Sequence, residues 1–208
     1  MSTTSQTQDK PQFIDIVLDL ETLALSEDAA ILQIGCALPQ FSANKLLKRA
    51  NHIIPFFEAT IAYEQAINSE FSKDPDTLDW WEKQSVEARK SVFSGQDSYI
   101  DAFEKLRDWM LSIKAAGFEI RLWGNGPEFD NRILDYALNC FNIRDLWNFR
   151  NNHSMRTAQL FFPQDKDWCE EMGKRYIKHT ALGDASYEAD ILDGVAYDAY
   201  MGFCQELS

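Results

Sequence analysis

The chain has 208 residues, of which 45% are hydrophobic and 13% aromatic, and its formal net charge is −13. The length fits one globular domain, and the apolar and aromatic content excludes a globally disordered chain. The acidic balance disfavours passive adhesion to nucleic acid, which depends on Lys and Arg neutralising phosphates.

The cysteines and the hydropathy pattern place the chain among cytoplasmic proteins. Its four cysteines lie far apart without a CxxC pair, so we expect reduced thiols rather than a disulfide framework or a zinc site. No apolar run approaches the ~20 residues that span a bilayer, and the polar N-terminus lacks the apolar core of a signal peptide. We therefore expect no membrane association.

The first third of the chain predicts a short leader followed by strands. Residues 1–11 are polar and indicate a flexible leader, so we expect one domain over residues 12–208. Three apolar runs are strand candidates and suggest an antiparallel meander: 13–20, 29–38 and 45–54.

The rest of the chain predicts mainly helices. Helical spacing covers 75–93, with Asp76 or Thr77 as the N-cap, and it recurs at 98–115, 128–139 and 184–205. A short strand is expected at 118–123, and no element is assigned within 142–178. Strands followed by interleaved helices predict an α/β fold with a mixed central sheet flanked by helices.

Two carboxylates follow the first strand. Strand alternation places Asp19 and Glu21 on one face and Leu20 on the other. Mg²⁺ and Mn²⁺ prefer hard oxygen ligands of this kind. The pattern DxE is short, however, and a solvated acidic turn explains it equally well.

Two later segments also carry candidate residues. In the run from Gly124 to Asp130, glycines allow a tight approach after a strand, and Asp130 lies at a helix start, where capping is the more common role of Asp. Further on, His179 precedes by five positions Asp184, which opens the last helix. The near-neutral pKa of histidine suits general-base chemistry at physiological pH.

The order and placement of these segments resemble the DEDDh group of the DnaQ-like 3′→5′ exonucleases over residues 13–205. Asp19 and Glu21 match the first motif of that group. Asp130 within NGPEFD matches the second, and His179 with Asp184 in HTALGDA matches the third. The resemblance implies an RNase H-like fold, two divalent ions (Mg²⁺ or Mn²⁺), and release of nucleoside 5′-monophosphates.

Within that superfamily the chain is similar to small exonucleases of the exoribonuclease AS type and to phage exonuclease A. The similarity lies in the AILQIG stretch, in the WWEKQ helix and in the dipeptide Arg156-Thr157. It implies a homodimer.

These residue types support a two-metal mechanism. Asp19, Glu21 and Asp184 could hold one ion, and Asp19 could bridge to a second ion, about 3.5–4 Å away, that Asp130 supports through water. His179 would accept a proton from the attacking water, without a covalent enzyme intermediate.

Substrate contacts are predicted less directly. Leu23 could wedge against the terminal base and Trp81 could stack on a base, although core packing is the common role of both residue types. The further candidates are Thr22, Gln84, Asn125 and Arg156, with Lys174, Arg175 and Lys178 for backbone phosphates.

We therefore expect a 3′→5′ exonuclease that acts on single-stranded nucleic acid, with RNA favoured over DNA. A 3′→5′ exodeoxyribonuclease is the main alternative, because recognition of RNA needs a contact to the 2′-hydroxyl. A non-catalytic binding module of the same fold and a phosphohydrolase of small nucleotides are the other two.

Overall fold

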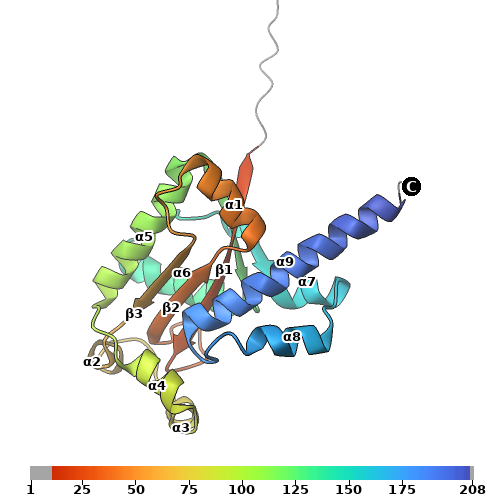
Figure 1. The fold of residues 1–208 in the computed structure, drawn as a ribbon. Coiled ribbons are helices and arrows are strands. Elements are labelled where there is room, and N and C mark those ends of the chain that lie inside the picture. Colours follow the sequence, from red (N-terminus) through yellow and green to blue (C-terminus); the bar gives the residue numbers. More distant parts are fainter. Residues whose placement is uncertain (1–10, 207–208) are drawn as a thin grey trace, which may run out of the picture.

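A five-stranded mixed sheet forms the centre of the computed structural model, which describes residues 11–206 (Figure 1). The sheet order is β3-β2-β1-β4-β5. The pairs β1/β2 and β2/β3 are antiparallel, whereas β1/β4 and β4/β5 are parallel. The strands are β1 (Gln12–Thr22), β2 (Ile31–Ala37), β3 (Phe56–Thr60), β4 (Phe118–Gly124) and β5 (Asn152–Ser154). The expected α/β fold and its antiparallel meander are confirmed.

Helices cover both faces of the sheet. In Figure 1, α5 and α6 lie behind the sheet, and α9 crosses its front with α7 and α8 beside it. The helices comprise α1 (Gln40–Arg49), α2 (Tyr63–Ile67), α3 (Pro75–Glu82), α4 (Val86–Phe93), α5 (Tyr99–Ala115), α6 (Asp130–Cys140), α7 (Met155–Phe161), α8 (Lys166–Gly173), α9 (Ala181–Glu206) and the short 3₁₀ helix Phe149–Asn151. Among residues 11–206, no helix combines the length and apolarity of a membrane span.

Strand β1 is buried on both faces because it lies at the centre of the sheet. Ile16 and Leu18 belong to the core that contains α5 and α6, and Val17 packs with Ala185 and Leu192 of α9. This alternation follows from the two-residue period of a strand. The C-terminal end of β1, which carries the first acidic motif, therefore lies between two packed layers.

The strand expected at 45–54 is wrong. That segment begins inside α1 and ends in turns, and the third strand is β3. Ala43 and Leu46 are buried three residues apart, which is the spacing of one helix face. The apolar residues of the segment come in adjacent pairs, Leu46-Leu47 and Ile53-Ile54, and do not alternate as a half-buried strand requires.

The single helix expected at 75–93 is also wrong, because two capped helices occupy it. Helix α3 begins at Pro75, and its N-cap is Asp74 rather than Asp76 or Thr77; the Asp74 carboxylate accepts a hydrogen bond from the Asp76 N–H at 3.0 Å. Ser85 ends this stretch, and its hydroxyl accepts a hydrogen bond from the Ala88 N–H at 3.0 Å to start α4. Serine favours such caps over helix interiors.

The remaining elements match the expectation with small shifts. Helices α5 and α6 and strand β4 begin within two residues of the predicted positions, and α9 begins three residues before Asp184. The unassigned stretch 142–178 contains β5, α7 and α8. Of the expected leader, residues 1–10 lie outside the described residues.

Candidate active site

Asp19 and Glu21 lie at the end of β1 on the face opposite Leu20. Asp19 is partly buried, and Glu21 is 8% exposed. Burial and the charges of Asp130 and Glu21 raise the pKa of Asp19 well above its usual value. Burial, followed by the charges of Asp184 and Asp130, raises the pKa of Glu21 to about 8. Two buried carboxylates this close need a cation or protons to be stable.

Asp130 reaches the same place from the neighbouring strand. It lies in the first turn of α6, is 3% exposed, and its Oδ1 accepts a hydrogen bond from the Leu20 N–H at 3.3 Å. Burial raises its pKa to about 7. Gly124, at the end of β4, permits this approach, because a Cβ there would lie 2.5 Å from Asn131 Oδ1 and 3.3 Å from Asp130 Cβ.

His179 and Asp184 are positioned by the turn before α9. The Ala181 N–H donates a hydrogen bond to the buried Gln33 Oε1 of β2 at 2.9 Å. Gly35 of β2 lies directly under this turn, since a Cβ there would be 2.1 Å from the Ala181 carbonyl carbon. The turn is thus fixed on the sheet, one strand away from Asp19 and Glu21.

The three segments converge. Ligand atoms of Glu21, His179 and Asp184 all lie within 4.8 Å of one another. Asp19 and Asp130 share this environment, because both of their carboxylates interact electrostatically with Asp184 or with each other. Hard oxygen donors that are buried together and held with raised pKa values fit a site for Mg²⁺ or Mn²⁺.

A further carboxylate at this site, Glu188, was missed by the sequence motifs. It lies one helical turn after Asp184 on α9 and is 8% exposed. Burial, and then the charges of Asp130 and Asp184, raise its pKa to about 8. The signal in the sequence was the four-residue spacing from Asp184, which places both carboxylates on one helix face.

A cavity of about 430 Å³ opens beside Glu21. Its lining includes Thr22, Trp80 and Leu25, and the Leu25 side chain is 72% exposed. The Trp80 ring contacts the imidazole of His179 edge to face, with 4.9 Å between ring centroids. The exposed apolar surface next to the carboxylates suits a nucleobase.

The predicted contacts around β1 and α3 have different outcomes. Thr22 lines the cavity, and its hydroxyl donates a hydrogen bond to the Ala24 carbonyl at 2.7 Å. Leu23 is fully buried in the core, so the wedge role predicted for it is wrong. Trp81 is 2% exposed and donates from Nε1 to the Thr22 carbonyl at 2.9 Å. It forms the cavity wall, whereas Trp80 is the more exposed ring.

Gln84, Asn125 and Arg156 lie at the margin of the site. Gln84 Nε2 donates to the Trp80 carbonyl at 3.0 Å within its own helix. The Asn125 carbonyl accepts a hydrogen bond from the Arg156 N–H at 3.3 Å. The exposed Arg156 guanidinium is 3.7 Å from Glu128, and its charge opposes the rise in the pKa of Asp130.

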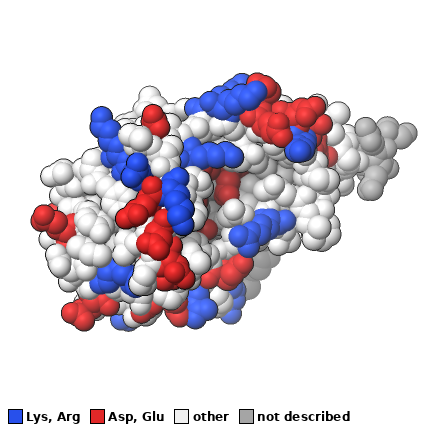
Figure 2. All heavy atoms as spheres, turned by 90° about the horizontal axis from the view of Figure 1, so that it is seen from below, with Lys and Arg blue, Asp and Glu red and all other residues white. Residues whose placement is uncertain are grey.

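The basic residues before His179 are exposed. Lys174 pairs with Glu171, and the charge of Lys178 opposes the rise in the pKa of Asp184. On the face seen from below, acidic atoms lie in a hollow near the centre, with Lys and Arg side chains on both sides (Figure 2). The net charge of −13 therefore coexists with local cations that can meet phosphates.

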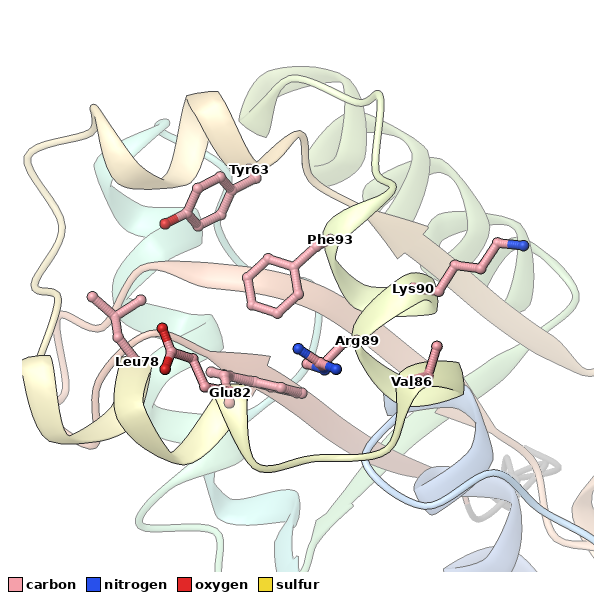
Figure 3. A pocket seen from close by; sticks show the side chains of 8 residues that line it. Tyr63, Leu78, Glu82, Val86, Arg89, Lys90 and Phe93 are labelled. Carbon is pink, nitrogen blue, oxygen red and sulfur yellow. The ribbon is translucent and has the colours of Figure 1, made fainter.

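A second cavity of about 680 Å³ lies between α2, α3 and α4, and Trp81 lines both cavities. Figure 3 shows Arg89 projecting into the space between α3 and α4, with Phe93 and Tyr63 on one side, whereas Lys90 points away. Trp81 is therefore a partition between two hollows, and its position affects both.

Comparisons with known proteins agree with this geometry. Cell-death related nuclease 4 (CRN-4) superimposes with a TM-score of 0.52 at 14% identity, covering 88% of this chain and 63% of that one. The nuclease domain of 3′hExo, a DEDDh family member bound to rAMP, superimposes with a TM-score of 0.55 at 13% identity, covering 90% and 93%. The fold is thus that of the RNase H-like DEDDh nucleases.

The family follows from the sequence match. The model of the 3′-5′ exoribonuclease Rv2179c-like domain matches residues 14–196, and the chain belongs to this family of nucleases. An exodeoxyribonuclease of Enterobacteria phage T4 is 25% identical over 129 residues, which are 58% of this chain and 53% of that protein. The chain spans about half the length of this curated relative.

Proposed function

We propose that the chain is a two-metal 3′→5′ exonuclease that removes nucleoside 5′-monophosphates from single-stranded RNA. The observation that carries this proposal is the cluster of Glu21, His179 and Asp184, whose ligand atoms lie within 4.8 Å beside an open apolar cavity. Glu21 and the cavity share an edge, so a terminal nucleotide in the cavity would bring its phosphate to the carboxylates.

The carboxylates divide the work of holding the ions. Asp19, Glu21 and Asp184 would hold one ion, and Asp130 would support the second with Asp19 between them. When bound, such ions polarise the phosphoryl group and stabilise the charge that develops on the leaving oxygen. Burial keeps these carboxylates in fixed positions and away from bulk water, which strengthens their interaction with a cation.

His179 would accept the proton of the attacking water. Its imidazole lies within 4.8 Å of the oxygens of Glu21 and Asp184, close to where the water would be oriented. The backbone hydrogen bond to Asp184 and the Trp80 ring hold its position. This suits a group that must be near the reacting atoms in a defined orientation.

Substrate contacts follow from the cavity. Trp80 and Leu25 offer exposed apolar surface to the terminal base, and Thr22 and Trp81 shape the wall behind it. Arg156 would meet a backbone phosphate, and Gln84 and Asn125 support the neighbouring segments. The homodimer and the cytoplasmic location expected from the sequence stay predictions.

The choice of RNA rests on the description of the matched family, which names an exoribonuclease. Hydrolysis of DNA is the second candidate, because the phage relative is an exodeoxyribonuclease. The test offers 5′-labelled single strands of RNA and DNA with the same sequence, with Mn²⁺, and compares kcat/KM. Faster shortening of RNA supports the proposal, and faster shortening of DNA replaces it with the second candidate. Binding of either strand without shortening would support a non-catalytic module.

A further inference from the structure

Glu188 is directed at the acidic cluster by its place on α9. It follows Asp184 by four residues, so the two side chains lie on the same helix face one turn apart. This part of α9 packs on β1 and β2, and Glu188 is 8% exposed. The carboxyl group is therefore enclosed between the helix and the strand that carries Asp19.

The Glu188 carboxylate lacks the partners that other buried carboxylates have. Its Oε2 is inaccessible to solvent and has no hydrogen-bond partner among residues 11–206. Asp15, which is 2% exposed, shows the contrast: its two oxygens accept hydrogen bonds from Arg121 Nη2 and Trp123 Nε1, each at 2.9 Å. Buried polar groups in native proteins are almost always paired, and a lone buried oxygen points to a missing ligand.

The charges around Glu188 indicate on which side of the cluster it lies. Apart from burial, the strongest effects on its pKa come from Asp130 and Asp184, and the charge of Arg156 opposes them. The close group of ligand atoms formed by Glu21, His179 and Asp184 does not include it. Glu188 thus belongs to the half of the cluster that contains Asp130.

We propose that Glu188 is a fifth carboxylate of the metal centre and binds the divalent ion on the Asp130 side, together with Asp130 and the shared Asp19. This inference rests on the proposed function, because it assumes that the cluster holds Mg²⁺ or Mn²⁺. It gives the buried oxygen a partner and gives the Asp130 side a second carboxylate of its own. Sites for Mg²⁺ commonly combine one or two carboxylates with water and substrate phosphate.

The test measures metal binding directly, without substrate. Mn²⁺ is titrated calorimetrically into the full chain, into Glu188→Gln and into the control Asp198→Asn, which removes one exposed carboxylate from the same helix. We expect two Mn²⁺ ions in the parent and in the control. In Glu188→Gln one site should weaken by about tenfold or more, while the other stays within about twofold. The melting temperature of Glu188→Gln in EDTA should not fall, because the substitution removes a buried oxygen without a partner.

The outcomes separate this inference from the proposed function. Two unchanged Mn²⁺ sites in Glu188→Gln, above all with a lower melting temperature in EDTA, would make Glu188 a structural residue and overturn the inference alone. A parent protein that binds no Mn²⁺ and shortens no oligomer would overturn the proposed function as well. If Glu188→Gln does not fold, Glu188→Met is titrated in its place; weakened binding by a folded Met variant supports the inference, and failure of both variants to fold overturns it.

Discussion

The backbone N–H of His179 donates a hydrogen bond to the Asp184 carboxylate at 2.9 Å, across the turn that starts α9. His179 has a φ of 61°, in the left-handed region that non-glycine residues seldom occupy. The bond links the proposed base to a proposed metal ligand, so neither residue can shift without the other. Strain of this kind persists where the surrounding structure fixes it, and it is common at functional sites.

We predict that His179→Asn abolishes most hydrolysis but keeps metal binding. Asparagine accepts a positive φ better than most residues, so the turn should persist, while the proton acceptor is lost. A general base contributes about 10²–10⁴-fold to the rate, and kcat should fall by that order with Mn²⁺ affinity unchanged. The exposed His52 gives the matched control, His52→Asn. A large loss of Mn²⁺ affinity in His179→Asn would instead make His179 a ligand.

We predict that Gly35→Ala damages both stability and activity. Its new Cβ would lie 2.1–2.3 Å from backbone atoms of Ala181 and Leu182, so the start of α9 would have to move away from β2. Overpacking of this kind costs about 1–3 kcal/mol. Gly202→Ala on the same helix meets nothing within 4 Å and should leave the melting temperature unchanged or raise it. Equal effects of the two substitutions on melting and hydrolysis would contradict this account of the α9 turn.

We predict that Trp80→Ala raises KM for single-stranded substrates, whereas Trp80→Phe largely preserves it. Trp80 is 40% exposed, lines the cavity beside Glu21 and contacts the His179 ring. Stacking of a base on an aromatic side chain contributes about 1–3 kcal/mol, so KM should rise at least about fivefold. Steady-state kinetics on an oligomer checks this. Trp168→Ala, at a 37% exposed tryptophan of α8, should have no effect, and an unchanged KM in Trp80→Ala would exclude the proposed stacking.

We predict that the metal-free protein loses stability as the pH rises from about 5 to about 8.5. The pKa values of Glu21 and Glu188 are raised to about 8 and that of Asp130 to about 7. The folded state therefore binds more protons than the unfolded state in this range, and its stability falls as these protons leave. Divalent ions favour the ionised carboxylates, so the stabilisation by Mn²⁺ should grow over the same range. Thermal melts in EDTA and in Mn²⁺ check both trends, and a Mn²⁺ effect independent of pH would contradict them.

The sequence predicted the converging segments because each motif marks a junction between elements that physics constrains. Asp19 and Glu21 end a buried strand, and Asp130 opens a helix after glycines. Leu23 was misassigned because the register of β1 shifts between Glu21 and Thr22. This irregularity interrupts the alternation that would have placed Leu23 beside the carboxylates, and it turns the side chain into the core.

Other features depend on tertiary packing that local patterns do not contain. The spacing of Asp184 and Glu188 was visible, but only the packing of α9 on β1 buries the second carboxylate. Likewise, Trp80 and Trp81 are adjacent aromatic residues of one helix, and the sequence favoured the wrong ring. The hydrogen bond from Trp81 to the Thr22 carbonyl places Trp81 inside and leaves Trp80 exposed at the cavity.

The most direct test of the central claim is hydrolysis of a 5′-labelled single-stranded RNA by the parent protein and by Asp19→Asn, each with Mn²⁺ and with EDTA. Asp108→Asn removes an exposed carboxylate of α5 and serves as the control. We predict a ladder that shortens from the 3′ end, requires Mn²⁺, is retained in Asp108→Asn and is lost in Asp19→Asn. A ladder that persists in EDTA or in Asp19→Asn would contradict a metal-dependent nuclease centre at the end of β1.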